Sequence, residues 1–407
     1  RDLQNACLLE EGDRGWWWDE ETVRLHDTVR DMVLWITGPE LLVFAGRTNT
    51  ACVPQWEIAK RVSWESSMLP YESLNCPNMT TLLLFLRTRR SLKRRFQIPG
   101  GFFTHMPALR VLDLSPSFFR LEFPIEITFL VRLQYLNLTS SRVPILPREF
   151  GNLVNLRHLI LDQNNLRRIP WEAVSTLTRL QVLKMRWCGY VFGRDASHPL
   201  LELNDLEHLK QLCDLSLTVE SWPSLEKIAD SDLLQASVTS LTVTFDHGSP
   251  SGTIMAMKIG KLSNLRHLLL QDNPEQPMEG ELRFHPGQLP NLESLRLGNF
   301  TNVTILELLL RRLRRLDIVH CHGFTELTWA GQLACLEMIS VSDCHRVTEL
   351  LADGSSLPSD DSSSFPKLRV MHLDGLPALD RISTRPLLLP SMEDLYVRFC
   401  PCLKQLP

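Results

Sequence analysis

The sequence predicts an α/β solenoid whose core is a curved parallel β-sheet, and three observations lead to this fold class. An apolar pattern, L-x-x-L-x-L with Met, Ile or Val allowed, recurs along most of the 407 residues. Successive copies begin 21 to 32 residues apart, close to the roughly 20–29 residues of a leucine-rich repeat. The ninth position of several copies is Asn or Cys, which this repeat also requires.

Thirteen copies of the apolar core give the predicted sheet its strands. The copy from Leu156 to Leu166 fits the longer pattern L-x-x-L-x-L-x-x-N-x-L at every position. Alternating apolar residues lie on one face of a short strand. A single repeat cannot bury that face, whereas stacked neighbours can, and the stack forms a curved sheet. The cores begin at Met79, Leu109, Leu133, Leu156, Leu180, Leu212, Val238, Leu265, Leu292, Leu313, Leu336, Leu368 and Met392.

Position nine accounts for four of the ten cysteines. We expect its side chain to point inward and to satisfy backbone groups of the turn that follows the strand. The remaining cysteines show no paired spacing of the kind that closes the ends of an extracellular array. We therefore expect reduced thiols and a cytosolic or nuclear protein. Position nine is occupied by Asn164, Asn273, Cys188, Cys321, Cys344 and Cys400.

The first 40 residues do not follow the repeat. The acidic, turn-rich segment from Glu10 to Glu21 could form a hairpin. Apolar residues then recur at helical spacing between Thr22 and Ile36, and Gly38-Pro39 would end that helix. Residues 41–78 are expected to be a linker or an N-terminal cap of the solenoid, and residues 79–407 the repeat domain.

Two repeats and both chain ends depart from the regular pattern. The long steps after Leu180 and Leu336 carry Gly189–Leu209 and the Ser- and Asp-rich segment Ala352–Ser364. The composition of the second segment indicates an exposed loop. Because the first residue is Arg1 rather than Met, we expect the start of the protein to be missing. The array reaches Pro407 without an obvious polar cap, so the natural chain is expected to continue or to end in an irregular turn.

The sequence gives no support for catalysis by this chain. The Gly260-Lys261 pair has Met255 and Leu262 where a phosphate-binding loop needs Gly and Ser or Thr. The patterns G-x-S-x-G and H-E-x-x-H are absent from the sequence. We read the histidines and cysteines between His320 and His345 as turn residues rather than as ligands of a metal ion.

Charge and hydropathy exclude two further classes of function. The net charge is −4, and no apolar run approaches the roughly 18–20 residues that span a bilayer. Basic residues cluster in Arg87–Arg95 and again between Arg311 and Arg315, without interleaved aromatic residues. We expect these clusters to face solvent or an acidic protein surface rather than nucleic acid.

Several stretches resemble the C-terminal part of plant nucleotide-binding leucine-rich-repeat disease resistance proteins of the coiled-coil class. Val23–Ile36 looks like the M-H-D motif and following helix of their winged-helix part. Cys76–Leu84 and Gly101–Leu114 look like their first repeats, and Met392–Pro407 looks like their last repeats. The resemblance covers nearly the whole chain, with residues 1–40 as the end of the small winged-helix part of the nucleotide-binding module.

The resemblance implies a nucleotide-linked role for two residues. In the family the motif histidine contacts bound ADP and helps to hold the off state, a role that would fall on His26 with Asp27 beside it. Leu25 stands where the family has Met, which is a small apolar change. The phosphate loop and magnesium-binding residues would precede Arg1. This chain alone is therefore expected to bind no cofactor, whereas the full-length parent would bind ADP or ATP.

The resemblance also implies a function. The parent would be an intracellular, cytoplasmic immune receptor in which the repeats recognise a pathogen effector or a guarded host protein and restrain an ADP/ATP switch. Its partners would include the nucleotide-binding module of the same molecule, and no nucleic acid. Peripheral membrane association through the part before Arg1, and oligomerisation of the full-length protein on activation, would be consistent with it. Two alternatives stay open: a substrate adaptor of a ubiquitin ligase and an extracellular receptor domain.

Partner contacts are predicted on the concave face of the sheet. Positions three, five and seven of each core point away from the buried leucines. Trp187 lies just past this row and could add an aromatic anchor. The predicted contact residues are His158, Ile160, Asp162, Val182, Lys184, Arg186, Trp187, Arg315, Asp317, His372, Asp374, Tyr396 and Arg398.

Overall fold

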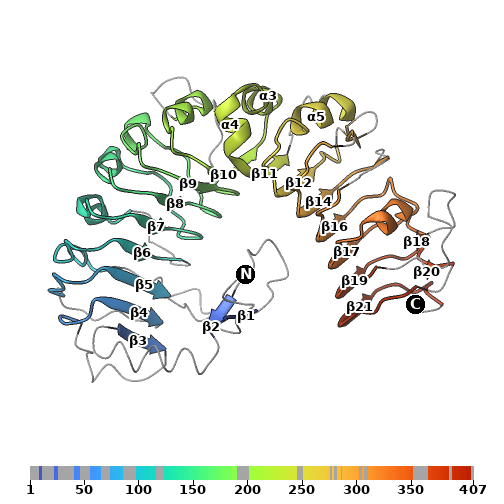
Figure 1. Ribbon diagram of the computed structural model, residues 1–407, viewed down its shortest axis with the longest axis horizontal. Helices are drawn as coiled ribbons and strands as arrows, with labels where there is room; N and C mark the ends of the chain where they lie inside the picture. Colours follow the sequence, from blue (N-terminus) through green and yellow to red (C-terminus); the bar gives the residue numbers. More distant parts are fainter. Residues whose placement is uncertain are drawn as a thin grey trace.

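The computed structural model confirms the leucine-rich-repeat solenoid. Fifteen strands form one parallel sheet in the order β21-β19-β17-β16-β14-β12-β11-β10-β9-β8-β7-β6-β5-β4-β3. The sheet bends into an open arc whose inner side is lined by these strands (Figure 1). The structure describes residues 9–11, 23–25, 41–45, 56–65, 74–85, 98–115, 123–189, 201–244, 251–275, 277–278, 282–285, 287–301, 305–306, 310–351, 365–384 and 387–404.

Each of the thirteen predicted cores holds one strand of the main sheet. In the first half these are β5 (Thr81–Phe85), β6 (Val111–Asp113), β7 (Tyr135–Asn137), β8 (His158–Ile160), β9 (Val182–Met185), β10 (Asp214–Val219) and β11 (Val238–Thr244). The second half contains β12 (His267–Gln271), β14 (Ser294–Gly298), β16 (Arg315–Val319), β17 (Met338–Ser342), β19 (Val370–Asp374) and β21 (Asp394–Arg398).

Strand formation follows from the alternation of the core. Side chains at positions one, four and six are buried in every repeat from β5 to β19, as for Leu156, Leu159 and Leu161, which are at most 1% exposed. Removing one such side chain from water contributes about 1.5–3 kcal/mol. The intervening positions in β8 and β9 are half-exposed on the concave face. In β21, the terminal strand of the sheet among the described residues, the core positions are exposed.

A tight turn follows most strands. Among the described residues, position eight has a positive φ in eight repeats, including Gln163 (56°), Trp187 (53°) and Phe399 (52°). Position nine then enters the core. Asn164 is buried, donates to the carbonyl oxygens of Leu138 and Leu161 at 2.7 and 2.9 Å, and accepts from the Val143 N–H at 3.1 Å. This is the turn role that the sequence predicted.

The cysteines fill the same position in other repeats. Cys188, Cys321 and Cys344 are buried and form no disulfide, as predicted, whereas Cys400, which follows β21, is only half-buried. Asn273 was expected to point inward, and this was wrong. Its Oδ1 accepts from the Glu275 N–H at 2.9 Å, and the side chain is only half-buried. Asp272 is buried in its place, because the turn after β12 extends to Met278, whose N–H it binds at 3.0 Å.

The outer side of the arc carries short helices and two small sheets (Figure 1). The 3₁₀ helices in the described part of the chain are η2 (Ile125–Phe129), η3 (Arg148–Asn152), η4 (Trp171–Ala173), η5 (Leu203–His208) and η6 (Thr328–Gln332). The α-helices are α3 (Trp222–Asp230), α4 (Asp232–Ser237) and α5 (Gly252–Ile259). β13 (Leu282–Arg283) pairs with β15 (Ile305–Leu306), and β18 (Glu349–Leu351) pairs with β20 (Arg381–Ser383).

The repeat register changes once, at the centre of the array. Leu215, at position four, pairs with Leu183 at position four of β9. Leu217, at position six, pairs with Leu241 at position four of β11 after an irregularity between Leu215 and Ser216. A slip of two residues keeps the apolar face on the same side of the sheet. The core therefore remains continuous where α3 and α4 replace the short helices.

The segment before the first predicted core differs from expectation in two places. Leu9–Glu11 (β1) and Val23–Leu25 (β2) pair antiparallel, which agrees with the hairpin. Residues 23–25, expected to begin a helix, are therefore strand, and the rest of that expected helix lies outside the described residues. Residues 41–78, expected to be a linker or cap, contain β3 (Leu41–Ala45) and β4 (Arg61–Glu65) of the main sheet.

Candidate recognition surface

The concave face is hollowed over the first predicted repeats. The hollow measures about 410 Å³ and lies over strands β5 to β8. It is open to solvent, and most of its lining residues are half-exposed. This hollow, referred to below as the concave hollow, is lined by Leu83, Val111, Asp113, Gln134, Tyr135, Arg157 and His158.

Aromatic and apolar groups form the floor of the concave hollow. Tyr135 and His158 lie opposite each other on β7 and β8, with ring centroids 5.9 Å apart. Leu83 and Val111 continue the apolar surface onto β5 and β6. Aromatic side chains bury a large area at a low cost in conformational entropy, which suits them to anchoring a bound protein.

Charge at the concave hollow is uneven. The Asp113 carboxylate accepts hydrogen bonds from the Ser115 hydroxyl at 2.6 Å and from the Asn137 amide at 3.1 Å, so it is already engaged. Arg157, at position two of its core, is exposed and has no ion-pair partner among the described residues. The hollow therefore offers an apolar floor with a cationic edge, which suits a partner segment that combines apolar and acidic residues.

Most of the predicted contact residues in the middle repeats are accessible to solvent. His158 lines the concave hollow, and Ile160, Val182 and Lys184 are half-exposed beside it. Trp187 is 37% exposed, as an anchor requires, and its backbone N–H donates to the Thr218 hydroxyl at 2.9 Å.

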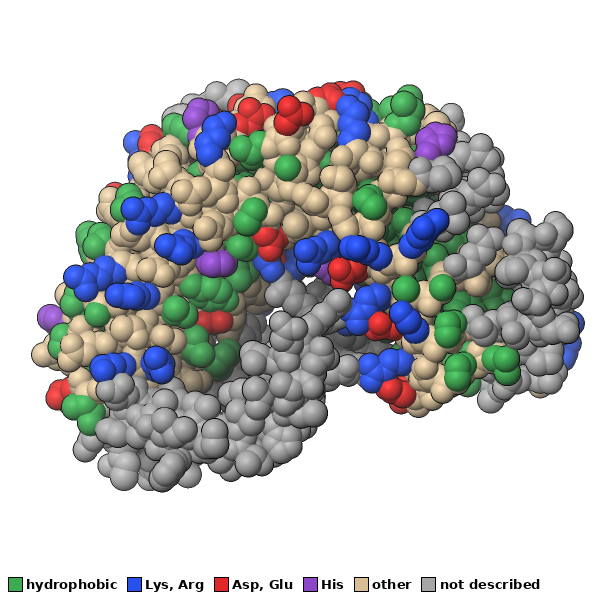
Figure 2. Space-filling model, viewed as in Figure 1, with side chains coloured by type: hydrophobic (Ala, Val, Ile, Leu, Met, Phe, Trp, Pro, Cys, Tyr) green, Lys and Arg blue, Asp and Glu red, His purple; other side chains and the backbone are tan. Residues whose placement is uncertain are grey.

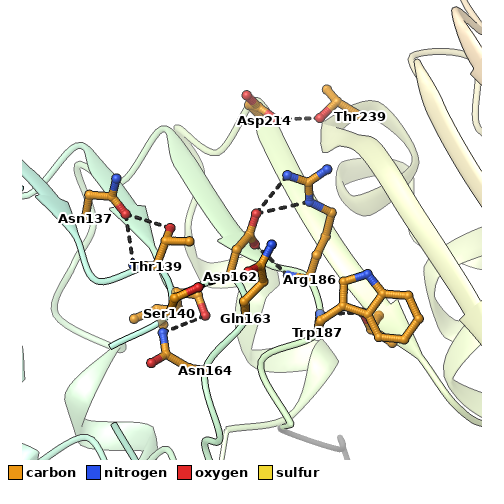
Figure 3. Close-up of polar contacts among 12 residues, drawn as sticks. Asn137, Thr139, Ser140, Asp162, Gln163, Asn164, Arg186, Trp187, Asp214 and Thr239 are labelled. Carbon is orange, nitrogen blue, oxygen red and sulfur yellow. Dashed lines mark hydrogen bonds and ion pairs between the residues drawn. The ribbon is translucent and has the colours of Figure 1, made fainter. Parts of the chain in front are cut away.

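Asp162 and Arg186 instead join two repeats (Figure 3). Asp162 is only 6% exposed. Arg186 donates to its Oδ2 through Nη2 at 2.8 Å and Nε at 3.1 Å, and the Arg186 backbone N–H donates to Oδ1 at 2.7 Å. A carboxylate that accepts three hydrogen bonds in a nearly buried position holds the turns of β8 and β9 together.

Three of the predicted residues in the last repeats, Asp317, His372 and Tyr396, lie in a row at position five. Arg296 and Asp317 make an ion pair of 3.2 Å, and Ser340 comes next in register. His372 is 7% exposed and lies under the Tyr396 ring, with centroids 4.6 Å apart. At position seven, Arg398 contacts Asp374 through Nη2 at 3.0 Å. Arg315 is half-exposed at position three.

Burial dominates the electrostatics of this row. It raises the pKa of Asp317, and the nearby Arg296 guanidinium opposes that change. It lowers the pKa of His372, while the carboxylates of Asp374 and Asp317 oppose the change. His372 is therefore neutral near pH 7 and contributes to the row by packing, whereas Tyr396 and Arg398 are exposed.

Position two adds an alternating series of charges along the same strands. In register, β14 to β21 are preceded by Glu293, Arg314, Glu337, Arg369 and Glu393. Arg314 binds Glu337 in a bidentate pair of 2.8 and 2.9 Å, and Arg369 binds Glu393 at 2.6 Å. Basic and acidic side chains accordingly lie side by side along the inner rim of the arc in its C-terminal half (Figure 2). The charges there are largely matched to each other, unlike Arg157.

Sequence comparison places the chain among known proteins over its whole length. It is 30% identical over 414 residues to a probable disease resistance protein of Arabidopsis thaliana, covering 100% of this chain and 40% of that protein. It is 26% identical over 421 residues to the Arabidopsis thaliana disease resistance protein RPS5, covering 100% of this chain and 43% of RPS5. The chain is homologous to the C-terminal part of plant disease resistance proteins. It spans less than half the length of these relatives.

Two other comparisons were with family models and with solved structures. No family model matches the sequence. An internalin of Listeria monocytogenes has a TM-score of 0.45 at 14% identity, covering 79% of this chain and 81% of the internalin. A leucine-rich-repeat protein of Leptospira interrogans has a TM-score of 0.46 at 18% identity, covering 83% and 90%.

The structure describes one of two sites that the sequence brought into question, the possible metal site but not the nucleotide-linked one. His26 and Asp27 lie outside the described residues. The histidines and cysteines considered for a metal ion are described, and no group of three metal-binding side chains occurs in that part of the chain. The His322 and His345 rings stack on each other, with centroids 4.6 Å apart, while Cys321 and Cys344 are buried in their turns.

Sequence reasoning missed most of the concave hollow. It chose contact residues from Leu156 onward, although the same rule of outward positions applies to the earlier cores. Applied to the cores at Met79, Leu109 and Leu133, that rule selects Leu83, Val111 and Tyr135. Arg157 could not have been found in this way, because position two is not an outward strand position.

Proposed function

We propose that this chain is the recognition and autoinhibitory domain of an intracellular plant immune receptor. It would bind a pathogen effector or a guarded host protein and, in the absence of that partner, restrain an ADP/ATP switch in the rest of the receptor. The whole-length similarity to disease resistance proteins supports this class of function. The chain itself would perform no catalysis.

The concave hollow is the observation that supports the recognition part of the proposed function. It combines an aromatic and apolar floor with an exposed arginine, whereas Arg314 and Arg369, at position two of later repeats, are matched by glutamates. A surface with apolar anchors and an unmatched cation favours a protein segment that brings apolar and acidic side chains. Tyr135 and His158 would be the principal anchors.

The autoinhibitory part of the proposed function is based on the resemblance of Val23–Ile36, which includes His26, to the M-H-D motif of the family. A ring N–H of His26 would donate to an oxygen of the ADP diphosphate in the intact receptor, with Asp27 supporting the histidine. The nucleotide would be held mainly by the remainder of the receptor. The repeat domain would complete the restraint through contacts with the nucleotide-binding module of the same molecule.

A specific observation favours this function over an extracellular receptor domain. The cysteines in the described part of the chain form no disulfide, and the buried thiols of Cys321 and Cys344 contact backbone carbonyl oxygens. Extracellular solenoids of this kind usually carry disulfides. In the part of the chain that the structure describes, no helix has the length and apolar character needed to cross a membrane.

The restraint is tested by Asp27→Val in the intact receptor. A hydrogen bond to a charged group contributes about 1.5–3 kcal/mol. Its loss would shift a two-state switch about 10- to 150-fold toward the active form. We therefore expect spontaneous cell death in leaf tissue without any effector. Asp31→Val, the same change four residues further on, should leave the basal signal unchanged. A well-expressed Asp27→Val receptor that stays silent would contradict the proposal.

A further inference from the structure

A row of unbalanced positive charge runs along the starts of strands β6 to β9, which lie side by side in the arc (Figure 1). Arg110 and Arg157 occupy position two of their cores, and Arg132 and Arg179 directly precede the first residue of theirs. All four side chains are exposed. The first six cores have no Asp or Glu at either of these positions. These four residues are called the arginine rim below.

Backbone pairing fixes the spacing of the position-two residues in the arginine rim. Gln134 lies between Arg110 and Arg157. Its N–H donates to the Arg110 carbonyl, and its carbonyl accepts from the Arg157 N–H, both at 2.8 Å. Neighbouring strands lie about 4.8 Å apart, so the two arginines start about 10 Å apart on the same edge of the sheet. Gln134 and Arg157 also line the concave hollow, which therefore opens directly onto the arginine rim.

The C-terminal half of the same sheet shows which group completes such a row. Glu337 lies between Arg314 and Arg369 through the same two backbone hydrogen bonds, again at 2.8 Å. Its carboxylate accepts from Arg314 Nε and Nη2 at 2.8 and 2.9 Å. Gln134 holds the equivalent place in the arginine rim, and its neutral amide cannot offset a guanidinium charge. The arginine rim therefore lacks the carboxylate that its counterpart has.

No ion pair in the described part of the chain neutralises the arginine rim. Arg179 donates through Nη1 to the uncharged Asn155 Oδ1 at 2.7 Å. Val131 directly precedes Arg132, and Val154 holds the same place in the next repeat; their side chains are 50% and 46% exposed. Accessible apolar groups among cations suit a protein partner better than a nucleic acid, whose contacts are mainly with phosphate and sugar.

We infer that the arginine rim binds an acidic segment of a separate protein, laid across strands β6 to β9. One carboxylate of this segment enters between Arg110 and Arg157, in the place that Glu337 takes between its two arginines. Apolar side chains of the segment contact Val131 and the concave hollow. Charge complementarity of this kind fixes the register of a partner and speeds its association. The inference rests on the proposed recognition function of the concave hollow and adds where the acidic residues of the partner bind.

Charge reversal tests the binding of an acidic segment. The probe is a fluorescently labelled copolymer of glutamate and tyrosine, whose anisotropy reports binding to the purified 407-residue chain. Arg110→Glu with Arg157→Glu should raise the Kd for this copolymer at least about tenfold, because like charges then face it. Arg167→Glu with Arg346→Glu is the matched control, because it makes the same change in net charge at exposed residues after β8 and β17. This control should bind like the natural sequence. Equal losses from both pairs, or no binding by the natural sequence, overturn the inference.

A glutamate within the chain tests the position of the missing carboxylate. Gln134→Glu should pair with the arginines on either side and compete with the copolymer, so the Kd should rise several-fold at low ionic strength. Gln163→Glu, the same change at an exposed residue beyond the other end of β8, should leave the Kd unchanged. Circular dichroism verifies the fold of each variant. Unchanged binding by Gln134→Glu would exclude the site between Arg110 and Arg157.

Two further measurements identify the kind of partner and separate this inference from the proposed function. A single-stranded oligonucleotide or phosphatidylserine vesicles that bind the arginine rim more tightly than the copolymer would contradict an acidic protein as the partner. Suppose that Arg110→Glu with Arg157→Glu binds the copolymer normally, while Tyr135→Glu with His158→Glu abolishes the response of the intact receptor to the pathogen. The inference is then wrong and the proposed function stands.

Discussion

At the scale of single residues, position eight shows how the turn overrides side-chain preference. A left-handed backbone costs most residues roughly 1–2 kcal/mol, and of the eight residues that adopt it there only Gly375 is glycine. Gln163 and Trp187 adopt it because the strand before them and the buried position nine after them fix the path of the chain. The residue types at this position therefore could not predict the conformation, whereas the buried residue that follows could be predicted.

The buried thiols give a prediction at the same scale. Burial is the largest cause that raises the pKa of Cys321 and of Cys344 to about 12, from a usual value of 9.0. The folded state therefore holds these protons more tightly than the unfolded state. The free energy of unfolding should be unaffected by them below pH 9 and should fall as the pH rises from 9 toward 12. Each thiol should contribute a slope of up to about 1.4 kcal/mol per pH unit.

Denaturant unfolding between pH 8 and 10.5 measures this slope, and Cys344→Ala should reduce it by the share of one thiol, up to about 1.4 kcal/mol per pH unit. In native protein at pH 8, iodoacetamide should modify the exposed Cys213 and Cys402 but leave Cys321 and Cys344 intact. Rapid modification of Cys321, or its recovery in a disulfide, would contradict the buried turn role and the register of the repeats.

At the scale of elements, an ion pair between neighbouring repeats matters according to its burial. Arg186→Ala should lower the free energy of unfolding by about 3–5 kcal/mol, because it leaves the Asp162 carboxylate nearly buried without its cation. Arg148→Ala is the matched control. It breaks a 3.8 Å pair with Glu172 whose side chains are 65% and 42% exposed, and it should cost less than about 1 kcal/mol. Equal losses in urea unfolding would refute the assignment of Asp162 to inter-repeat packing.

The elements were predictable to the extent that they carry the full repeat pattern. Thirteen strands follow from L-x-x-L-x-L cores, because period-two burial is local to each core. β4 was missed because its buried residues are Ala59, Val62 and Trp64, and neither Ala nor Trp belongs to the pattern. The register slip between β10 and β11 was also not predictable, since a shift of two residues leaves the apolar alternation unchanged.

At the scale of the whole molecule, the arc separates two kinds of concave surface. Toward β21 the outward charges largely neutralise one another, and several predicted contact residues are committed to that network. Over β5 to β8 the surface is hollowed, aromatic and edged by an exposed arginine. The sequence predicted the concave face as the recognition surface. It could not predict this division, because the pairing of charges depends on which residues stand in register across strands.

The most direct test of the recognition surface is the pathogen-triggered response of the intact receptor when the concave hollow is altered. Tyr135→Glu with His158→Glu places two carboxylates on its floor without touching the buried core, so we expect the effector-dependent rise in ion leakage from leaf tissue to be lost at normal protein levels. Ile145→Glu, at a 48% exposed position outside the main sheet, is the control and should respond normally. A full response from the Tyr135→Glu, His158→Glu receptor would contradict the assignment of recognition to the concave hollow.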